Sequence, residues 1–304
     1  MKKSTIIVHD GSYHTDDLFA VAALTLLLPP ESVHIVRTRD KATIEEGDYV
    51  VDVGGVYDEA RHCFDHHQIE GAGVRENGIP YASFGLVWKF CGEKLCGSKE
   101  IVDVIDKKLA EPIDANDNGV SLAEYKFPDT QMYLLQDFLY AFRPTWKEET
   151  SLDSVFFELL ETARKLIKRE IKIATDEKEA EVFVRAAYEQ STDKRLIVLE
   201  KYWPWKDVIR AHTEPLFVVH PERSGNWCVQ AVQDKPSSFI NRKDFPAEWA
   251  DKHDKELADI SGVSDAIFCH KESFIAYARS REGAIALAKK AINSIESAKS
   301  PANN

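Results

Sequence analysis

Short apolar runs alternate with helical patterns in the first half of the chain, and this alternation restricts the fold more than any other feature. Residues 4–9 (STIIVH), 32–38 (SVHIVRT) and 48–55 (DYVVDVGG) are typical of strands. Residues 15–28 (TDDLFAVAALTLLL) are typical of a helix, with Thr15 as the expected N-cap. Strands that alternate with helices predict a parallel sheet in an α/β domain, and ligands of such sheets bind where the strands end.

A second region follows a long helical pattern that contains neither Gly nor Pro and covers residues 151–190. Beyond it, short strands, a hairpin turn at residues 222–226 (ERSGN) and a final helix predict another α/β unit. We therefore expect a doubly wound, mostly parallel sheet in an N-terminal domain, residues 1–190. The long helix would join it to a smaller C-terminal α/β domain, residues 191–304, and the chain length of 304 residues fits two domains.

Charge and cysteine content limit the classes of function. The chain has 39 basic and 51 acidic residues and a net charge of −12, which argues against broad, nonspecific adhesion to nucleic acid or an anionic membrane. The five scattered cysteines are expected to be reduced thiols. No signal-peptide core, transit sequence or membrane span is evident, so we expect a soluble, cytoplasmic protein without a membrane partner.

Histidines and aspartates gather in four segments that the pattern places at the ends of elements. They are His9, His14, Asp16 and Asp17 after the first strand, Asp52 after another, the run Asp65-His66-His67, and Asp114 and Asp117 at the end of a helical stretch. Imidazole and carboxylate donors without thiolates suit Mn²⁺, Fe²⁺ or Zn²⁺, and the share of carboxylates favours Mn²⁺. Adjacent side chains on a strand point to opposite faces, so the Asp-His-His run is expected to divide three tasks.

The number of candidate ligands exceeds what one metal ion needs, so two ions are the more economical interpretation. Asp52, alone at the end of its strand, is the candidate bridge. A bridged pair of ions fits hydrolysis of a phosphoester or phosphoanhydride. Each residue alone also has a structural interpretation: His9 as a satisfied strand-end histidine, Asp16 and Asp17 in a first helical turn, and Asp114 and Asp117 in a turn. Their coincidence with the Asp-His-His run favours a site.

The ordered set of motifs HDGSYHTDD, VVDVGG, FDHHQ and DANDNG resembles the DHH phosphoesterase superfamily, and within it the MYG1 (UPF0160) group. VRTRD, RPTW, PWK and FCHKESFIAYARSREGA extend the resemblance over nearly the whole chain. It implies a DHH-type catalytic domain, a DHHA1-like substrate-binding domain, and Mn²⁺-dependent 3′–5′ exonuclease activity on RNA. It also implies one metal held by His9, His14 and Asp52, and another held by Asp16, Asp52, His66 and Asp117. His67 would then face the substrate phosphate, and Asp65 would orient its neighbours.

The second domain is expected to grip the substrate. Arg279 and Arg281 stand beside a turn and a helix start, which suits phosphate recognition, and His270 is a lesser candidate. The same arginines could equally be solvated surface charges.

These observations predict a metal-dependent phosphodiester hydrolase with two Mn²⁺ ions and a metal-activated water, although Mg²⁺, Zn²⁺ or Fe²⁺ could replace Mn²⁺. The expected catalytic residues are Asp52, Asp65, His66 and His67. The expected substrate is single-stranded RNA or a short oligonucleotide, and a homodimer is possible. Two alternatives stay open: a phosphohydrolase of oligoribonucleotides, cyclic dinucleotides or pyrophosphate, and a non-catalytic metal- or nucleotide-binding protein. The choice between Asp114 and Asp117 as ligand is also open, with Asp117 favoured.

Overall fold

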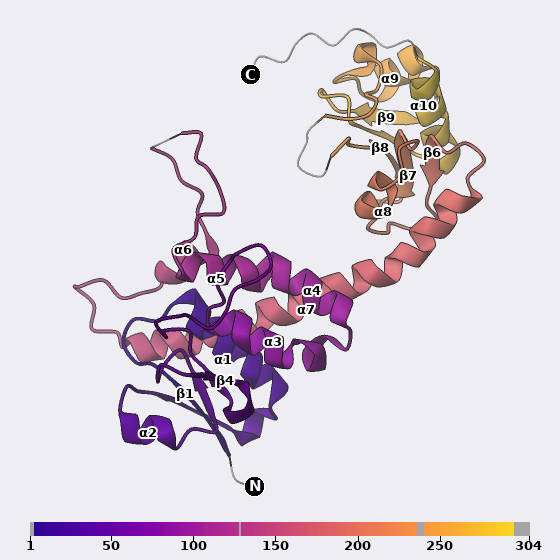
Figure 1. Ribbon diagram of the computed structural model, residues 1–304. Coiled ribbons are helices and arrows are strands. Elements are labelled where there is room, and N and C mark those ends of the chain that lie inside the picture. The colour runs from indigo at the N-terminus through magenta and orange to yellow at the C-terminus, as the bar shows by residue number, and fades with distance from the viewer. Residues whose placement is uncertain (1–2, 128, 236–239, 295–304) are drawn as a thin grey trace. The chain divides into compact units, whose positions relative to one another are not determined.

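Two compact units make up the chain in the computed structural model (Figure 1). The described residues are 3–127, 129–235 and 240–294. The units are Met1–Thr175 and Asp176–Asn304, and the boundary lies within helix α7, Leu152–Gln190. The domain boundary predicted between residues 190 and 191 falls at the end of this helix and stays a prediction. In the described ranges, no helix combines the length and apolar character needed to cross a membrane.

The first unit is built on a five-stranded sheet of order β2-β1-β3-β5-β4. Its strands are β1 (Ser4–Val8), β2 (Val33–Arg37), β3 (Tyr49–Val51), β4 (Tyr57–Asp58) and β5 (Cys63–Phe64). Neighbouring strands are parallel except for β4, which runs antiparallel to β5 at the edge. The α/β prediction is confirmed. The bounds of the short strands β4 and β5 were not predicted, because two residues carry no readable period.

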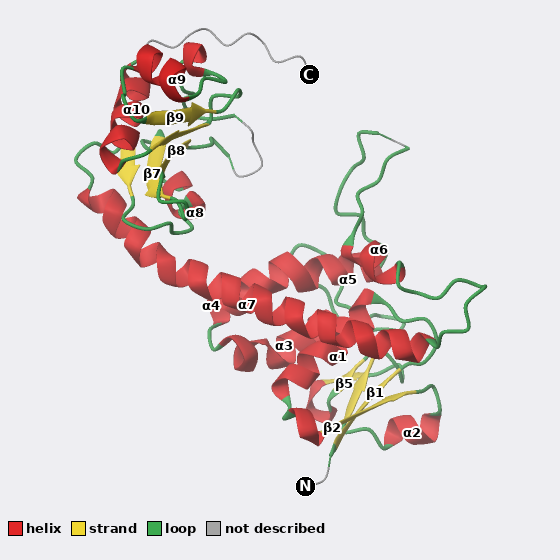
Figure 2. Cartoon of the chain, turned by 180° about the vertical axis from the view of Figure 1, so that it is seen from behind, coloured by secondary structure: helices red, strands yellow, loops and turns green. Residues whose placement is uncertain are grey.

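Helices cover the two faces of this sheet unequally (Figure 2). The helical elements of the first unit besides α7 are α1 (Thr15–Leu27), α2 (Lys41–Glu45), α3 (Ser83–Cys96), α4 (Lys99–Ile105), the π-helical turn η3 (Asp106–Ala110), α5 (Glu111–Asp117), α6 (Leu135–Tyr140), and the 3₁₀ turns η1 (Pro30–Ser32) and η2 (Glu59–Arg61). One face packs against α1, α3 and α7 in the main core. On the other face, Ile44 of α2 packs against Ile7 and Val50.

Helix α1 lies at the centre of the first core. Eleven of its thirteen residues are buried, which explains why its sequence is apolar on nearly every side. His14, in extended conformation, occupies the N-cap position, and its backbone N–H donates to Asp17 Oδ1 at 2.9 Å. The expectation that Thr15 is the N-cap is therefore wrong by one residue. The reason is that the Asp17 carboxylate binds the free N–H group of His14.

The second unit has its own sheet, of order β6-β7-β8-β10-β9. Its strands are β6 (Leu196–Val198), β7 (Phe217–Pro221), β8 (Trp227–Ala231), β9 (Ala266–Cys269) and β10 (Ile275–Ala278), and its helical elements are α8 (Lys206–Arg210), η4 (Ala247–Trp249), α9 (Asp254–Ser261) and α10 (Arg281–Asn293). Only β6 and β7 are parallel, so the sheet is mixed. The predicted hairpin joins β7 to β8.

Candidate metal centre

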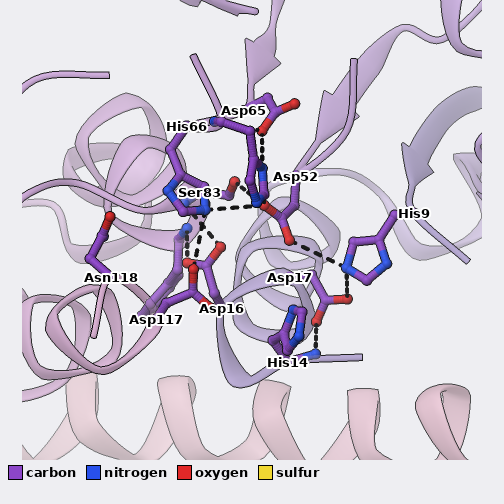
Figure 3. Close-up of polar contacts among 12 residues, drawn as sticks. His9, His14, Asp16, Asp17, Asp52, Asp65, His66, Ser83, Asp117 and Asn118 are labelled. Atoms are coloured by element: carbon purple, nitrogen blue, oxygen red, sulfur yellow. Dashed lines mark hydrogen bonds and ion pairs between the residues drawn. The ribbon is translucent and has the colours of Figure 1, made fainter. Parts of the chain in front are cut away.

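Three parallel strands of the first unit end side by side. Val8 of β1 pairs with Val51 of β3, and Val51 pairs with Phe64 of β5. The residues that directly follow these strand ends are His9, Asp52 and Asp65. The register of the sheet therefore gathers at one edge polar residues that are up to 56 positions apart (65 − 9) in the sequence (Figure 3).

Asp52 lies at the centre of the cluster and is 97% buried (3% exposed). Its backbone has φ of +53°, a left-handed conformation that persists only where the surroundings impose it. Here its N–H donates to Phe64 O at 3.1 Å, and Ser83 Oγ donates to its Oδ1 at 3.1 Å. Asp52 Oδ2 lies 3.3 Å from His9 Nε2, and Oδ1 lies 3.4 Å from His66 Nε2. The two oxygens of one carboxylate thus face two different histidines, as a bridging ligand requires.

One group of candidate ligands joins His9, His14 and Asp52, with one donor atom of each within 4.8 Å of the others. His9 Nδ1 lies 2.9 Å from the Asp10 carbonyl, which fixes the proton on Nδ1 and leaves Nε2 free to bind a metal. Asp17 Oδ2 is 2.9 Å from His9 Nε2, without hydrogen-bond geometry. Asp17 is among the residues that gather in the sequence but belongs to neither predicted set of ligands, and spacing alone does not show that its carboxylate lies beside His9.

Another such group joins Asp16, His66 and Asp117, again with donor atoms within 4.8 Å. His66 Nε2 lies 3.1 Å from Asp117 Oδ2. The fully buried Asp16 also accepts the backbone N–H groups of Ser83 at 3.0 Å and Phe84 at 2.7 Å. These are free donors of the first turn of α3, so Asp16 is fixed in place by the helix N-terminus.

Asp114 and Asp117 have different surroundings, although both belong to α5. Asp114 is fully buried, and its oxygens accept from Arg75 Nη1 at 2.7 Å and from the Gly85 N–H at 3.0 Å. Asp117 belongs instead to the group with His66. The geometry therefore favours a structural role for Asp114, through its pair with Arg75, and a place among the candidate metal ligands for Asp117.

His67 differs from His66 in exposure and partner. Its side chain is 60% exposed, and its Nδ1 lies 2.7 Å from Asp65 Oδ1. Asp65 is held in turn by the Gly55 N–H, which donates to its Oδ2. The three residues follow β5, which ends at Phe64, so the expectation that strand alternation separates them is wrong. They differ in direction because Asp65 turns back to bind the VGG segment while His66 points into the cluster (Figure 3).

Burial and close contact shift the pKa values of the residues in the cluster. Burial, and then the charges of Asp52 and Asp117, raise the pKa of Asp16 well above its usual value. Burial alone would raise the pKa of Asp52, but His66 and His9 outweigh it and lower that pKa. Burial alone would lower the pKa of His9, but Asp17 and Asp52 raise it to about 10. Ionised carboxylates packed this closely are stabilised by a cation, either a protonated histidine or a metal ion.

The residues of the cluster fit a divalent metal. Among the buried polar atoms that have no hydrogen bond within the part of the chain that the structure describes, three belong to the ligand cluster: His9 Nε2, His66 Nε2 and Asp17 Oδ2. Buried polar atoms without partners are costly, and nitrogen and carboxylate donors of this kind suit Mn²⁺, Fe²⁺ or Zn²⁺. A cavity of about 280 Å³ opens onto the cluster and is lined by His9, His14, Asp52 and His67, among others.

The predicted substrate residues of the second unit lie in ion pairs or local contacts there. Arg279 Nη2 lies 3.3 Å from Asp254 Oδ1, and Arg281 Nη2 lies 3.1 Å from Glu200 Oε1. Arg281 is the first residue of α10. His270 Nδ1 accepts the Glu272 N–H at 3.1 Å. Their role in substrate binding stays a prediction.

Known proteins resemble this chain over almost its full length. The family model MYG1_exonuc, described as "Uncharacterised protein family (UPF0160)", matches residues 5–292. The protein named "MYG1 exonuclease" of Bos taurus is 32% identical, over 95% of this chain and 84% of its own length. That of Homo sapiens is 31% identical, over 95% and 86%. "MYG1 protein C694.04c" of Schizosaccharomyces pombe is 27% identical, over 95% and 97%. The chain therefore belongs to the MYG1 (UPF0160) family.

Proposed function

We propose that the chain is a metal-dependent phosphodiester hydrolase, a 3′–5′ exonuclease on single-stranded RNA with a dinuclear Mn²⁺ centre. The observation that carries this is the position of Asp52 between two groups of ligands, with one carboxylate oxygen toward His9 and the other toward His66. The names of the animal relatives, "MYG1 exonuclease", support the reaction class.

Bound divalent ions would supply the activation of water and the neutralisation of phosphate charge. The protein would hold the first ion with His9, His14 and Asp52. It would hold the second with Asp16, Asp52, His66 and Asp117. Asp52 is preorganised for this task because its backbone conformation, the hydrogen bond of its N–H and the hydrogen bond from Ser83 Oγ fix the carboxylate.

His67 is the group that meets the substrate in this proposal. Burial opposes a charge on it, but Asp65, the largest influence, and Asp52 raise its pKa above the ordinary value. The bond between Nδ1 and Asp65 fixes the ring and leaves Nε2 for a phosphate oxygen. Since the side chain is 60% exposed, a substrate can reach it without any rearrangement of the buried cluster. His67 would therefore hold a phosphate oxygen by a charge-assisted hydrogen bond.

The test is turnover of a substrate panel after removal and return of metal. Protein treated with EDTA is assayed with Mn²⁺, Mg²⁺ or Zn²⁺ on RNA labelled at the 5′ or the 3′ end, on DNA, on a dinucleotide and on pyrophosphate. We expect Mn²⁺ to restore stepwise shortening of RNA from its 3′ end.

Asp52→Asn is the variant to test, because Asn tolerates the positive φ of this position and the substitution removes the charge while keeping the shape of the side chain. It should lose the activity, whereas Asp103→Asn, on the exposed surface of α4, should keep it. Shortening from the 5′ end, preference for pyrophosphate, or equal activity of Asp52→Asn would each contradict the proposal.

A further inference from the structure

An open groove adjoins the mouth of the metal centre. The groove has a volume of about 850 Å³, against about 280 Å³ for the cavity that opens onto the ligands. Arg39, Val53 and Gly54 line both, so the two spaces are neighbours. The groove runs beside α2, on the sheet face where Ile44 packs against Val50. A substrate longer than one phosphate group could therefore continue from the centre into this groove.

The lining of the groove combines an apolar surface with cations. Ile44 and Val56 are among its apolar residues, and Val56 is 42% exposed. Its charged residues are the cations Arg39, Lys41 and Arg61 and the single acid Glu45. In a chain of net charge −12, three cations against one anion is a local reversal of sign. Such a surface suits a polyanion that also carries flat apolar rings.

Arg39 stands where the groove meets the cavity of the metal centre. Its side chain is 64% exposed, and its Nε lies 3.3 Å from Asp10 Oδ1. An exposed ion pair of this kind contributes little, so a phosphate can replace the carboxylate at small cost. The guanidinium can bind two oxygens of one phosphate.

We propose that this groove binds the RNA chain on the 5′ side of the scissile phosphate, an inference that rests on the proposed function. Arg39, Lys41 and Arg61 hold successive phosphates, and a base lies against Ile44 and Val56. The metal centre determines which bond is cleaved. The groove makes the protein prefer an RNA chain to a small phosphodiester that has no neighbouring nucleotides.

A second large cavity, of about 490 Å³, lies beside α5 and the segment that leads into α6. Its lining is largely apolar, and Lys108 is its cation. Lys108 Nζ already lies 2.6 Å from Glu170 Oε2. Asp137 also lines this space. Its charge therefore does not favour a chain of phosphates, and the groove beside α2 is the better path.

The kinetic test compares two substrates on the full chain with Mn²⁺. Hexauridylate can fill the groove, whereas bis(p-nitrophenyl) phosphate has no neighbouring nucleotide. The variant Lys41→Ala/Arg61→Ala should lower the ratio of kcat/KM for hexauridylate to kcat/KM for the small ester by roughly tenfold. The salt slope for hexauridylate should fall by about 1.4, at about 0.7 for each lost phosphate contact.

Lys168→Ala/Arg169→Ala, which removes two exposed cations of α7, is the matched control and should keep the ratio. An unchanged ratio in Lys41→Ala/Arg61→Ala, or an equal fall in the control, would overturn the groove proposal while leaving the hydrolase intact. If the small ester is turned over by an Asp52-dependent reaction and hexauridylate is not, the groove proposal fails as well.

A cross-linking experiment tests whether the groove binds an oligonucleotide, and it does not depend on turnover of any substrate. Cys63 lines the groove, whereas Cys96 lies at the end of α3. In EDTA, hexauridylate with a pyridyl disulfide on its 5′ end should react with Cys63 faster than the free pyridyl disulfide does, and unlabelled hexauridylate should suppress the gain. Cys63→Ser should abolish the adduct. Equal rates with and without the oligonucleotide, or preferential reaction at Cys96, would refute the proposed path.

Discussion

Asp114 and Asp117 are three residues apart on one helix, and we predict that their removal has opposite consequences. Asp114→Ala takes a fully buried carboxylate from Arg75, whose side chain is 6% exposed, and from the Gly85 N–H. Breaking a buried ion pair from one side costs about 3–5 kcal/mol. Asp106 still contacts Arg75 at 2.8 Å, so the lower end, about 3 kcal/mol, is expected. For a unit of this size that corresponds to a fall in Tm of roughly 6–12 °C.

Asp117→Asn should leave the fold intact and remove the response to metal. The charge of Asp117 raises the pKa of Asp16 and also that of His66, so in the absence of metal Asp117 repels one neighbour and attracts the other. Because the two effects oppose each other, thermal unfolding in EDTA followed by circular dichroism should show Asp117→Asn to be close to the wild type in stability. With Mn²⁺, the rise in Tm should be lost and RNA cleavage should fall at least about 100-fold.

The reverse pattern would refute this assignment. If Asp114→Ala is stable in EDTA but loses the metal response, Asp114 is the ligand and the pair with Arg75 is secondary. If Asp117→Asn unfolds about 6 °C or more below the wild type in EDTA, its role is structural.

Three further predictions concern other sites. His67→Gln should lower kcat about 100-fold. The affinity for Mn²⁺ should change little, because the closest partner of His67 is Asp65. An equally large loss of Mn²⁺ affinity would instead show that His67 is a metal ligand. Gly85→Ala should destabilise the first unit by about 2–3 kcal/mol, because the new Cβ would overlap the Asp114 carboxylate. The same substitution made in the Asp114→Ala background should destabilise the unit much less. An equal loss of stability in both backgrounds would exclude this overlap as the cause. Burial lowers the pKa of His220 below 6.5, so on acidification the unfolded chain binds a proton before the folded chain does. The free energy of unfolding should therefore fall as the pH drops from 6.5 to the pKa of the folded state, by up to about 1.4 kcal/mol per pH unit. Urea titrations of the wild type and His220→Gln should differ in this slope, and equal slopes would contradict it.

The strand ends were the most predictable part of the site. Apolar runs ending at Val8 and Val51 predict parallel strands, and the ends of parallel strands meet at one edge, so His9 and Asp52 could be placed together from the sequence. The ligands proposed for a second ion could not be assigned from the sequence alone. Asp114 and Asp117 share a helix, and the partner that separates them, Arg75, lies 39 residues from Asp114 along the chain.

Other features depended on contacts between distant elements. Strand β5 has two residues, so no period in the sequence identifies it. Ser83 reaches Asp52 only because α3 begins beside the centre, and the same helix start holds Asp16. The π-helical turn η3 interrupts the helical stretch just before α5, which the pattern presented as continuous.

The proposed function depends on Asp52 as the bridge between two metal ions. The most direct measurement is electron paramagnetic resonance of the protein titrated with Mn²⁺, combined with the number of ions bound at equilibrium. We predict two ions per chain and the spectrum of an exchange-coupled pair, as expected for bridged ions about 3.5–4 Å apart. Asp52→Asn should lose the coupling, and Asp103→Asn should keep it. One ion per chain, or two uncoupled ions that do not respond to Asp52→Asn, would contradict the account.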